Sequence, residues 1–412
     1  MKTYLQRREK IYAPLREEGI FTWDTINGQE YALASYSLIS RSFREEIAYA
    51  TEGLGRVFNK IVSVVRRGDE ELLKKLGIPP AAFSAVRLLD PEGLVTTIGR
   101  FDFAQTPDGL KMLAFNSDVP NGIVESFYVN GKICAHFGIQ DPNEGMSRHL
   151  HEALTKTVEL YARAGYATQN IVFSAMGWHV EDRSTAEYLL QMSGLKARFV
   201  PLGDVRLYQN QLCAQVDGKL IPINVWYRIH PLEILAEDRD DEGFPTGAYV
   251  LDVIARRQLA IINPSVALLA QTKALQALIW NLHEQKLFFN EEEHRIISTY
   301  MLPTYRENHF LGSTPYVTKP ILGRAGGAVT LYNRQGIPVE HNPGFMYWNQ
   351  PVVYQKRVEM EPIQAETAQG IYRGHLLWSS FLVGGRASAI MARIDGPLSS
   401  NVSYFLPVGM KN

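Results

Sequence analysis

The sequence of 412 residues predicts a mixed α/β (α+β) fold, because segments with helical spacing alternate with short apolar strands along the whole chain. A βαβ unit in the middle of the chain supports this prediction. Residues 171–175 and 197–201 have the apolar character of buried strands, and residues 184–193 between them have that of a helix. A chain of this length buries a sizeable core and is expected to divide into more than one region.

Composition and charge exclude several classes of function. The 42 Lys and Arg residues balance 43 Asp and Glu residues, which argues against a nucleic-acid partner or an acidic membrane surface. Residues 1–18 are charged throughout and lack an apolar signal core, and residues 260–280 are interrupted by polar side chains. With only two cysteines no disulfide framework is expected, so a cytoplasmic protein without a membrane partner is predicted. The oligomeric state stays open.

Helices are expected at the start of the chain and again before the βαβ unit. Residues 44–67 carry apolar side chains at helical spacing, so residues 1 to about 85 are predicted to form a helical region. Residues 146–164 have a second apolar stripe of this kind. Residues 212–228 are expected to form a β-hairpin.

An earlier hairpin is predicted where residues 97–104 alternate, a Pro-Asp-Gly turn follows, and residues 110–116 run back. Successive side chains on a strand point to opposite faces, so the alternation assigns each residue to a face. The side chains expected to share a face are Arg100 with Asp102, Phe101 with Phe103, and Met112 with Ala114 and Asn116.

Arg100, Asp102 and Asn116 form the sharpest candidate for chemistry. The oxygen atoms of Asp102 and Asn116 suit Mg²⁺, which is a hard cation. Arg100 can stabilise charge on a transferring phosphoryl group or on an acyl phosphate. An ion pair on a strand face at a domain edge explains the same residues equally well.

Three further segments have features of anion-binding sites. A predicted strand at 316–320 delivers Lys319, and the glycine-rich segment 323–327 after it exposes backbone N–H groups, although it lacks the Gly-Lys-Ser/Thr of a Walker loop. Lys273 stands at the predicted start of a helix, where free amides favour anions. Arg393 repeats the Arg-x-Asp spacing of the hairpin. A flexible turn, a solvated lysine and a surface ion pair are the alternative interpretations.

Together and in this order, these segments resemble the synthetase domain of the glutathionylspermidine synthase family, and in particular its single-domain members. That family has a permuted ATP-grasp fold. The resemblance implies an N-terminal helical region with a metal- and phosphate-binding hairpin at 1–130, a pre-ATP-grasp-like α/β substrate domain at 131–260, and an ATP-grasp nucleotide-binding region with a glycine-rich lid at 261–412. The matching segments are Gly99-Arg-Phe-Asp-Phe103, Phe115-Asn-Ser-Asp118 with Glu125, Lys273, Lys319-Pro-x-x-Gly-Arg324, Val353-Tyr-Gln355 and Val383-Gly-Gly385 leading to Arg393-Ile-Asp395.

The resemblance implies ATP-dependent amide formation. A small-molecule or peptide carboxylate would attack the γ-phosphate of ATP, and an amine would displace phosphate from the resulting acyl phosphate, with Mg²⁺ as the metal. The roles implied by position are Arg100 and Arg393 in catalysis, Asp102 and Asn116 on Mg²⁺, Lys273, Lys319, Gly323, Gly326 and Gly327 on the phosphates, Gln355 at the adenine end, and Asp118, Glu125 and Arg228 beside the substrate.

Three departures from the family pattern affect this expectation. Ala114 stands where the family has a metal-binding glutamate, so one Mg²⁺ site is expected to be weakened or rebuilt. Thr185 and Ala186 stand where the family offers paired glutamates to a polyamine, and Val119 replaces a serine that contacts glutathione. The substrates are therefore expected to differ from glutathione plus spermidine.

Two functions stay open on the sequence. The first is an ATP-grasp acid–amine ligase, which the retention of Arg100, Asp102 and Lys319 favours. The second is a nucleotide-binding, catalytically impaired family member with a regulatory or scaffolding role, which Ala114 favours. For Arg228 two partners are open as well: an acidic substrate, or a structural ion pair with Glu233.

Overall fold

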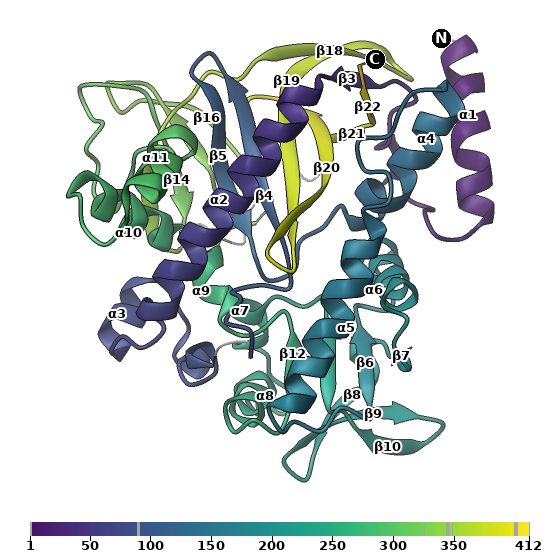
Figure 1. The fold of residues 1–412 in the computed structure, drawn as a ribbon, viewed down its shortest axis with the longest axis vertical. Coiled ribbons are helices and arrows are strands. Elements are labelled where there is room, and N and C mark those ends of the chain that lie inside the picture. The colour runs from purple at the N-terminus through teal and green to yellow at the C-terminus, as the bar shows by residue number, and fades with distance from the viewer. Residues whose placement is uncertain are drawn as a thin grey trace.

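The computed structural model describes residues 2–88, 91–324, 326–342, 347, 349–398 and 403–411 (Figure 1). Helices and strands alternate along the chain, which confirms the predicted mixed α/β fold. Within the described ranges, no helix combines the length and apolar character needed to cross a membrane. The α-helices are α1 Lys2–Glu17, α2 Arg41–Val65, α3 Glu70–Lys75, α4 Asn130–Phe137, α5 Ser147–Arg163, α6 Val180–Ser193, α7 Leu232–Leu235, α8 Thr246–Ala255, α9 Ala267–Gln271, α10 Lys273–Glu284 and α11 Glu291–Tyr300.

An antiparallel sheet of six strands joins the predicted hairpin to the C-terminal part of the chain. Its strand order is β21-β20-β19-β4-β5, and β18 pairs with β19. The two hairpin strands, β4 and β5, therefore share a sheet with strands that follow more than 240 residues later in the sequence, a separation longer than a typical domain. The bounds are β4 Ile98–Thr106, β5 Gly109–Asn116, β18 Pro362–Thr367, β19 Gly370–Val383, β20 Arg386–Asp395 and β21 Tyr404–Leu406.

Helix α2 lies across one face of this sheet (Figure 1). The side chain of Ser40 caps the start of the helix by accepting a hydrogen bond from the backbone N–H of Phe43. Phe58 on its buried face meets Phe101 and Phe115, whose rings stack at 3.9 Å between centroids. The predicted face assignment of β4 is thus confirmed, because Phe101 and Phe103 enter the core while Arg100 and Asp102 turn to the opposite side.

The predicted face assignment of β5 is wrong for Met112. A β-bulge shifts the register between Asp102 and Phe103, so that Asp102 pairs with Ala114 while Phe103 pairs with Met112. The extra residue, Leu113, breaks the alternation of the strand. Met112 is therefore buried in the core with the phenylalanines, whereas Ala114 and Asn116 line the opposite side.

A parallel sheet of four strands, in the order β12-β11-β6-β7, forms the lower part of the molecule in Figure 1, with α5 in front of it. Strands β6 and β7 with α6 between them confirm the predicted βαβ unit. The hairpin predicted over 212–228 is correct only as far as residue 222, because residues 225–228 form a central strand of the parallel sheet instead. The bounds are β6 Ile171–Ser174, β7 Ala197–Phe199, β11 Val225–Arg228 and β12 Ala260–Ile262.

A third sheet carries the glycine-rich segment and lies beside α10 and α11 (Figure 1). Its five strands follow the order β13-β17-β14-β15-β16 and are antiparallel. The glycine-rich segment follows β14, as predicted, and leads to β15, and Ala325 within the segment lies outside the described residues. The bounds are β13 Thr304–Tyr305, β14 Tyr316–Pro320, β15 Thr330–Tyr332, β16 Pro338–His341 and β17 Val352–Lys356.

The remaining strands are short. A three-stranded antiparallel sheet, β10-β9-β8, projects at the end of the molecule below the parallel sheet (Figure 1), and β22 pairs with β3 near the C-terminus. The region predicted to be helical, 1–85, thus also contains β1, β2 and β3. The division into three predicted regions stays a prediction, although the six-stranded sheet combines strands of the first region with strands of the third. The bounds are β1 Thr25–Ile26, β2 Gln29–Glu30, β3 Ser37–Ile39, β8 Val205–Tyr208, β9 Gln211–Val216, β10 Lys219–Pro222 and β22 Val408–Met410.

Candidate active site

A cavity of about 440 Å³ lies where the six-stranded sheet meets the five-stranded sheet. It is lined from the first sheet by β4, β5 and β20, from the second by β14, β15 and β17, and by the start of α10. The fold therefore brings the separate motifs of the sequence to one place, while Asp118, Glu125 and Arg228 do not line this cavity. The lining residues named from the sequence are Arg100, Asp102, Asn116, Lys273, Lys319, Gly323, Gly326, Gly327, Gln355 and Arg393.

Asp102 is the centre of a polar cluster on the sheet side of the cavity. Its carboxylate accepts two hydrogen bonds from Arg100, at 2.8 and 2.9 Å, and one from the amide of Asn116 at 3.0 Å. Ser379 donates at 2.8 Å, and Arg393 lies 3.4 Å away. Burial disfavours the charged carboxylate, but the two guanidinium groups outweigh it, and the pKa of Asp102 is lowered.

Two lysines face the cavity from the other side. The ammonium of Lys273 donates to the carbonyl oxygen of Gly323 at 2.8 Å, and that of Lys319 donates to Gln355 Oε1 at 2.6 Å and to the carbonyl oxygen of Leu113 at 3.0 Å. Among the described residues neither lysine has a carboxylate within ion-pair distance. Burial, together with the positive charge of Arg324, lowers the pKa of Lys273 to about 8, and burial, together with the positive charge of Lys273, lowers that of Lys319 to about 7.

The charges in the cavity fit the phosphates of a nucleoside triphosphate. Lys273 and Lys319 face it without a carboxylate partner among the described residues, and Arg393 shares the single carboxylate of Asp102 with Arg100 while its Nε atom is buried without a hydrogen-bond partner among the described contacts. Buried cations without anionic partners are unfavourable unless a ligand supplies the anion. A polyphosphate would supply it.

The cavity offers fewer ligands for Mg²⁺ than cationic groups for phosphates. Within the described part of the chain, no group of three or more His, Cys, Asp or Glu side chains could hold a metal. Asp102 with Asn116 offers one carboxylate and one amide, which suffices for an ion whose other ligands are phosphate oxygens and water. Ala114 lines the cavity directly opposite Asp102 in the strand pairing and contributes no ligand.

Three acidic side chains, Glu125, Glu181 and Asp182, lie outside the lining of the cavity; Glu125 and Glu181 interact with Arg100, and Asp182 interacts with Arg324. Glu125 is fully buried, accepts hydrogen bonds from Trp23 and Tyr31 at 3.0 Å each, and has an Oε2 atom without a partner among the described contacts. Burial raises the pKa of Glu125, and burial together with the charges of Glu125 and Asp182 raises that of Glu181 to about 8.

Sequence reasoning missed Glu181 and Asp182. It examined Thr185 and Ala186 for the polyamine contact, and both are buried inside α6. The acidic pair stands four residues earlier, which is about one helical turn, in the first turn of the same helix. Two adjacent acids at a helix start are a detectable signal, but only the fold shows that they lie near Glu125.

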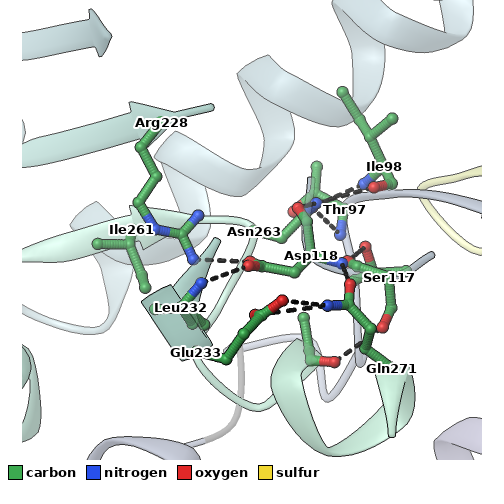
Figure 2. A network of polar contacts seen from close by, with 12 residues as sticks. Thr97, Ile98, Ser117, Asp118, Arg228, Leu232, Glu233, Ile261, Asn263 and Gln271 are labelled. Carbon is green, nitrogen blue, oxygen red and sulfur yellow. Dashed lines mark hydrogen bonds and ion pairs between the residues drawn. The ribbon is translucent and has the colours of Figure 1, made fainter. Parts of the chain in front are cut away.

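Asp118 and Arg228 belong to a second, buried network (Figure 2). Arg228 donates to Asp118 Oδ1 at 2.6 Å, and the backbone N–H of Leu232 donates to Oδ2 at 2.9 Å. Neither side chain of the ion pair is exposed. The structural pairing of Arg228 with Glu233 that the sequence left open is therefore wrong, because Glu233 instead accepts a hydrogen bond from Arg324 at 2.8 Å.

Comparisons with known proteins agree with this architecture. The sequence matches the family described as "Glutathionylspermidine synthase preATP-grasp" over residues 2–411, and the chain belongs to this family. A Haemophilus influenzae protein provisionally named an acid–amine ligase is 24% identical over 326 residues, covering 75% of this chain and 73% of that protein.

Two further proteins are similar to the chain. The bifunctional glutathionylspermidine synthetase/amidase of Escherichia coli is 23% identical over 348 residues, which cover 78% of this chain and 51% of that protein. The chain thus spans about half the length of this relative. The structure of a glutathione synthetase-like effector from Globodera pallida, in its apo form, matches with a TM-score of 0.59 and 12% identity over 100% of this chain and 97% of that one. This last likeness concerns the fold alone.

Proposed function

We propose that the protein is an ATP-dependent ligase that joins a carboxylic acid to an amine. ATP would supply a phosphoryl group that converts the substrate carboxylate into an acyl phosphate, and the amine would then displace phosphate to form the amide. The observation that carries the proposal is the pair of buried lysines, Lys273 and Lys319, which face a cavity shared with Arg100 and Arg393. Phosphoryl transfer depends mainly on positioning and charge neutralisation, which these groups provide.

The residues of the cavity divide the work by position. Lys273 and Lys319 would hold the phosphates. Gln355 donates a hydrogen bond to Thr304 and accepts one from Lys319, and it thereby orients the ammonium of Lys319. Arg100 and Arg393 lie beside Asp102 and would stabilise negative charge on the oxygen of the tetrahedral intermediate and on the transferred phosphoryl group. Asp102 and Asn116 would hold Mg²⁺, which would neutralise negative charge on the phosphates.

The acidic group beside Arg100 supports an amine as the second substrate. Glu125 and Glu181 interact with Arg100, the residue that would face the acyl phosphate, and Asp182 lies next to Glu181 on α6. Burial keeps Glu181 largely protonated near neutral pH, but a bound protonated amine would favour its charged form, and in that form the carboxylate could accept a proton from the amine. Asp118 and Arg228 form a buried ion pair outside the lining of the cavity, so we assign them a structural role beside the site.

The test is a release assay for ADP over a panel of small acids, peptides and amines, followed by mass spectrometry of the products. An amide product that requires both an acid and an amine is the expected result. ADP release that needs the acid alone, with a stable phosphorylated product, would contradict the ligase and indicate a kinase.

A second function has one observation in its favour. Ala114 leaves Asp102 as the carboxylate of a metal site that has no cluster of three acidic or histidine ligands among the described residues. A catalytically impaired, nucleotide-binding protein with a regulatory or scaffolding role would have this feature. Tight ATP binding with no turnover against the whole panel would favour this second function.

A further inference from the structure

Arg324 is the cationic side chain of the glycine-rich segment 321–329, and it is held by an acid from another part of the fold. Its Nε atom donates to Glu233 Oε1 at 2.8 Å, and its Nη2 atom lies 3.9 Å from Asp118 Oδ2. Glu233 lies on α7, which follows the central strand of the parallel sheet. The pair therefore connects the glycine-rich segment to the parallel α/β unit.

The acid that holds Arg324 is itself held in a buried network (Figure 2). Gln271, two residues before the phosphate-binding lysine of α10, donates to both oxygens of Glu233 at 3.3 and 3.5 Å. Asp118 is already occupied by Arg228 and by the backbone of α7. Because each acid has its own arginine, Glu233 is the partner that is left for Arg324, and its charged form is favoured by that arginine.

Besides the hydrogen bond from the backbone N–H of Leu322 to the side chain of Gln350 at 3.1 Å, the described part of the glycine-rich segment has two side-chain anchors of different kinds. The first is the ammonium of Lys273, which donates to the carbonyl oxygen of Gly323. Phosphate oxygens compete for this ammonium, so a bound nucleotide weakens the first anchor. The second anchor is the Arg324–Glu233 pair, which uses no phosphate-binding lysine and is compatible with a bound nucleotide.

We propose that the Arg324–Glu233 pair is a latch that fixes the glycine-rich segment over the phosphate end of the cavity, with Glu233 as a positioning residue. The latch itself rests on the contacts above, and its effect on catalysis rests on the proposed function. Opening the latch frees Arg324 and the backbone around Gly323. The segment then closes less completely over a bound nucleotide, which leaves sooner.

Limited trypsin digestion tests the latch directly, because Arg324 is isolated in the sequence. Lys319 is followed by Pro320, a bond that trypsin cleaves poorly, and the next basic residue is Arg334. Trypsin must insert the arginine side chain into its own specificity pocket, which a guanidinium held by Glu233 cannot enter. We expect Glu233→Gln to speed cleavage after Arg324 at least tenfold, read as the appearance of the 325–412 fragment by mass spectrometry.

Glu237→Gln is the matched control. Glu237 is exposed and lies four residues after Glu233, and its substitution removes the same charge. Equal cleavage rates for natural protein and Glu233→Gln, with equal melting temperatures, would overturn the latch. If Glu233→Gln does not fold, Arg324→Gln replaces it, and hydrogen exchange of residues 321–324 is expected to accelerate at least tenfold. Unchanged exchange in Arg324→Gln would overturn the latch equally.

The positioning role has a separate readout in the dissociation rate of a fluorescent ATP analogue. We expect this rate to rise at least fivefold in Glu233→Gln, while Glu237→Gln stays at the natural value. Faster cleavage without faster nucleotide dissociation would refute the positioning role. The digestion is carried out without nucleotide, so a natural protein that fails to bind ATP would refute the proposed function and leave the latch result standing.

Discussion

Ala114 lies directly opposite Asp102 in the pairing of β4 with β5, so that a methyl group faces a carboxylate across the sheet at the edge of the cavity. Asp102 is held there by Arg100, Asn116, Ser379 and Arg393. An acidic side chain at position 114 would therefore lie beside Asp102, where the resemblance to the family predicts a second metal ligand.

Adding a carboxylate at this place tests the metal site. We predict that Ala114→Glu tightens Mg²⁺-dependent nucleotide binding about tenfold, roughly 1.4 kcal/mol, because it supplies a hard oxygen ligand. The measurement is ATP affinity with and without Mg²⁺, and Ala114→Gln controls for side-chain size. Strong Mg²⁺ dependence in the natural protein that the glutamate weakens would show that the site is built around alanine, and the impaired-enzyme hypothesis would lose its main support.

Removing a cation from the cavity tests the nucleotide site. We predict that Lys319→Ala weakens ATP binding at least tenfold, about 1.4 kcal/mol, because its ammonium is buried at the cavity without a carboxylate partner. Calorimetric titration measures the affinity, and Lys219→Ala on the exposed strand β10 is the matched control. Unchanged affinity in Lys319→Ala would remove this lysine from the site.

The lowered lysine pKa values predict a pH dependence. Lys319 and Lys273 have pKa values of about 7 and about 8, so both ammonium groups are lost as the pH rises from 7 to 9. ATP prefers the charged forms, so its affinity should fall over this range and binding should take up protons. The stability of the fold changes in the opposite direction. Between pH 7 and 9 the unfolded chain binds more protons than the folded chain, so the free energy of unfolding increases as the pH rises.

Calorimetry in buffers of different ionisation enthalpy measures the number of protons taken up with ATP. Lys319→Ala should reduce that number near pH 7. Binding that is independent of pH between 7 and 9, with no proton uptake, would mean that neither lysine changes its charge when the nucleotide binds.

The acidic group beside Arg100 predicts a variant with an effect on the amine alone. We expect Glu181→Gln to raise the KM for the amine at least tenfold and to leave ATP affinity within twofold, because Glu181 interacts with Arg100 but does not line the cavity that Lys273 and Lys319 face. Glu187→Gln, on the outer face of the same helix, is the control. An unchanged KM for the amine would place the amine elsewhere.

The glycine-rich segment is predicted to be ordered further by the nucleotide. Backbone N–H groups of Gly326 and Gly327, which line the cavity, would turn toward the phosphates and exchange more slowly. Hydrogen exchange with and without a non-hydrolysable ATP analogue is expected to show at least tenfold added protection across residues 321–324 and 326–329. No added protection over these residues would contradict the lid.

The sequence by itself determined the fold class and most of the cavity. Hydrophobic periodicity predicted the βαβ unit and the β4–β5 hairpin, because a buried face repeats every two residues in a strand and every three or four in a helix. The motifs around Arg100, Lys319 and Arg393 carry their chemistry in short segments, so each was identified without knowing its neighbours. The resemblance to the family supplied their common function, which periodicity does not contain.

Tertiary structure alone decided which side chains meet. The bulge at Leu113 moves Met112 into the core, since strand register is set by pairing with β4 rather than by the local pattern. Arg228 binds Asp118 rather than Glu233, although Glu233 follows it by only five residues in the sequence. The reason is that strand β11 of the parallel sheet directs the side chain of Arg228 toward the segment after β5. Such partners are separated by more than a hundred residues in sequence, and their pairing is determined by packing and charge balance across elements, which local spacing does not encode.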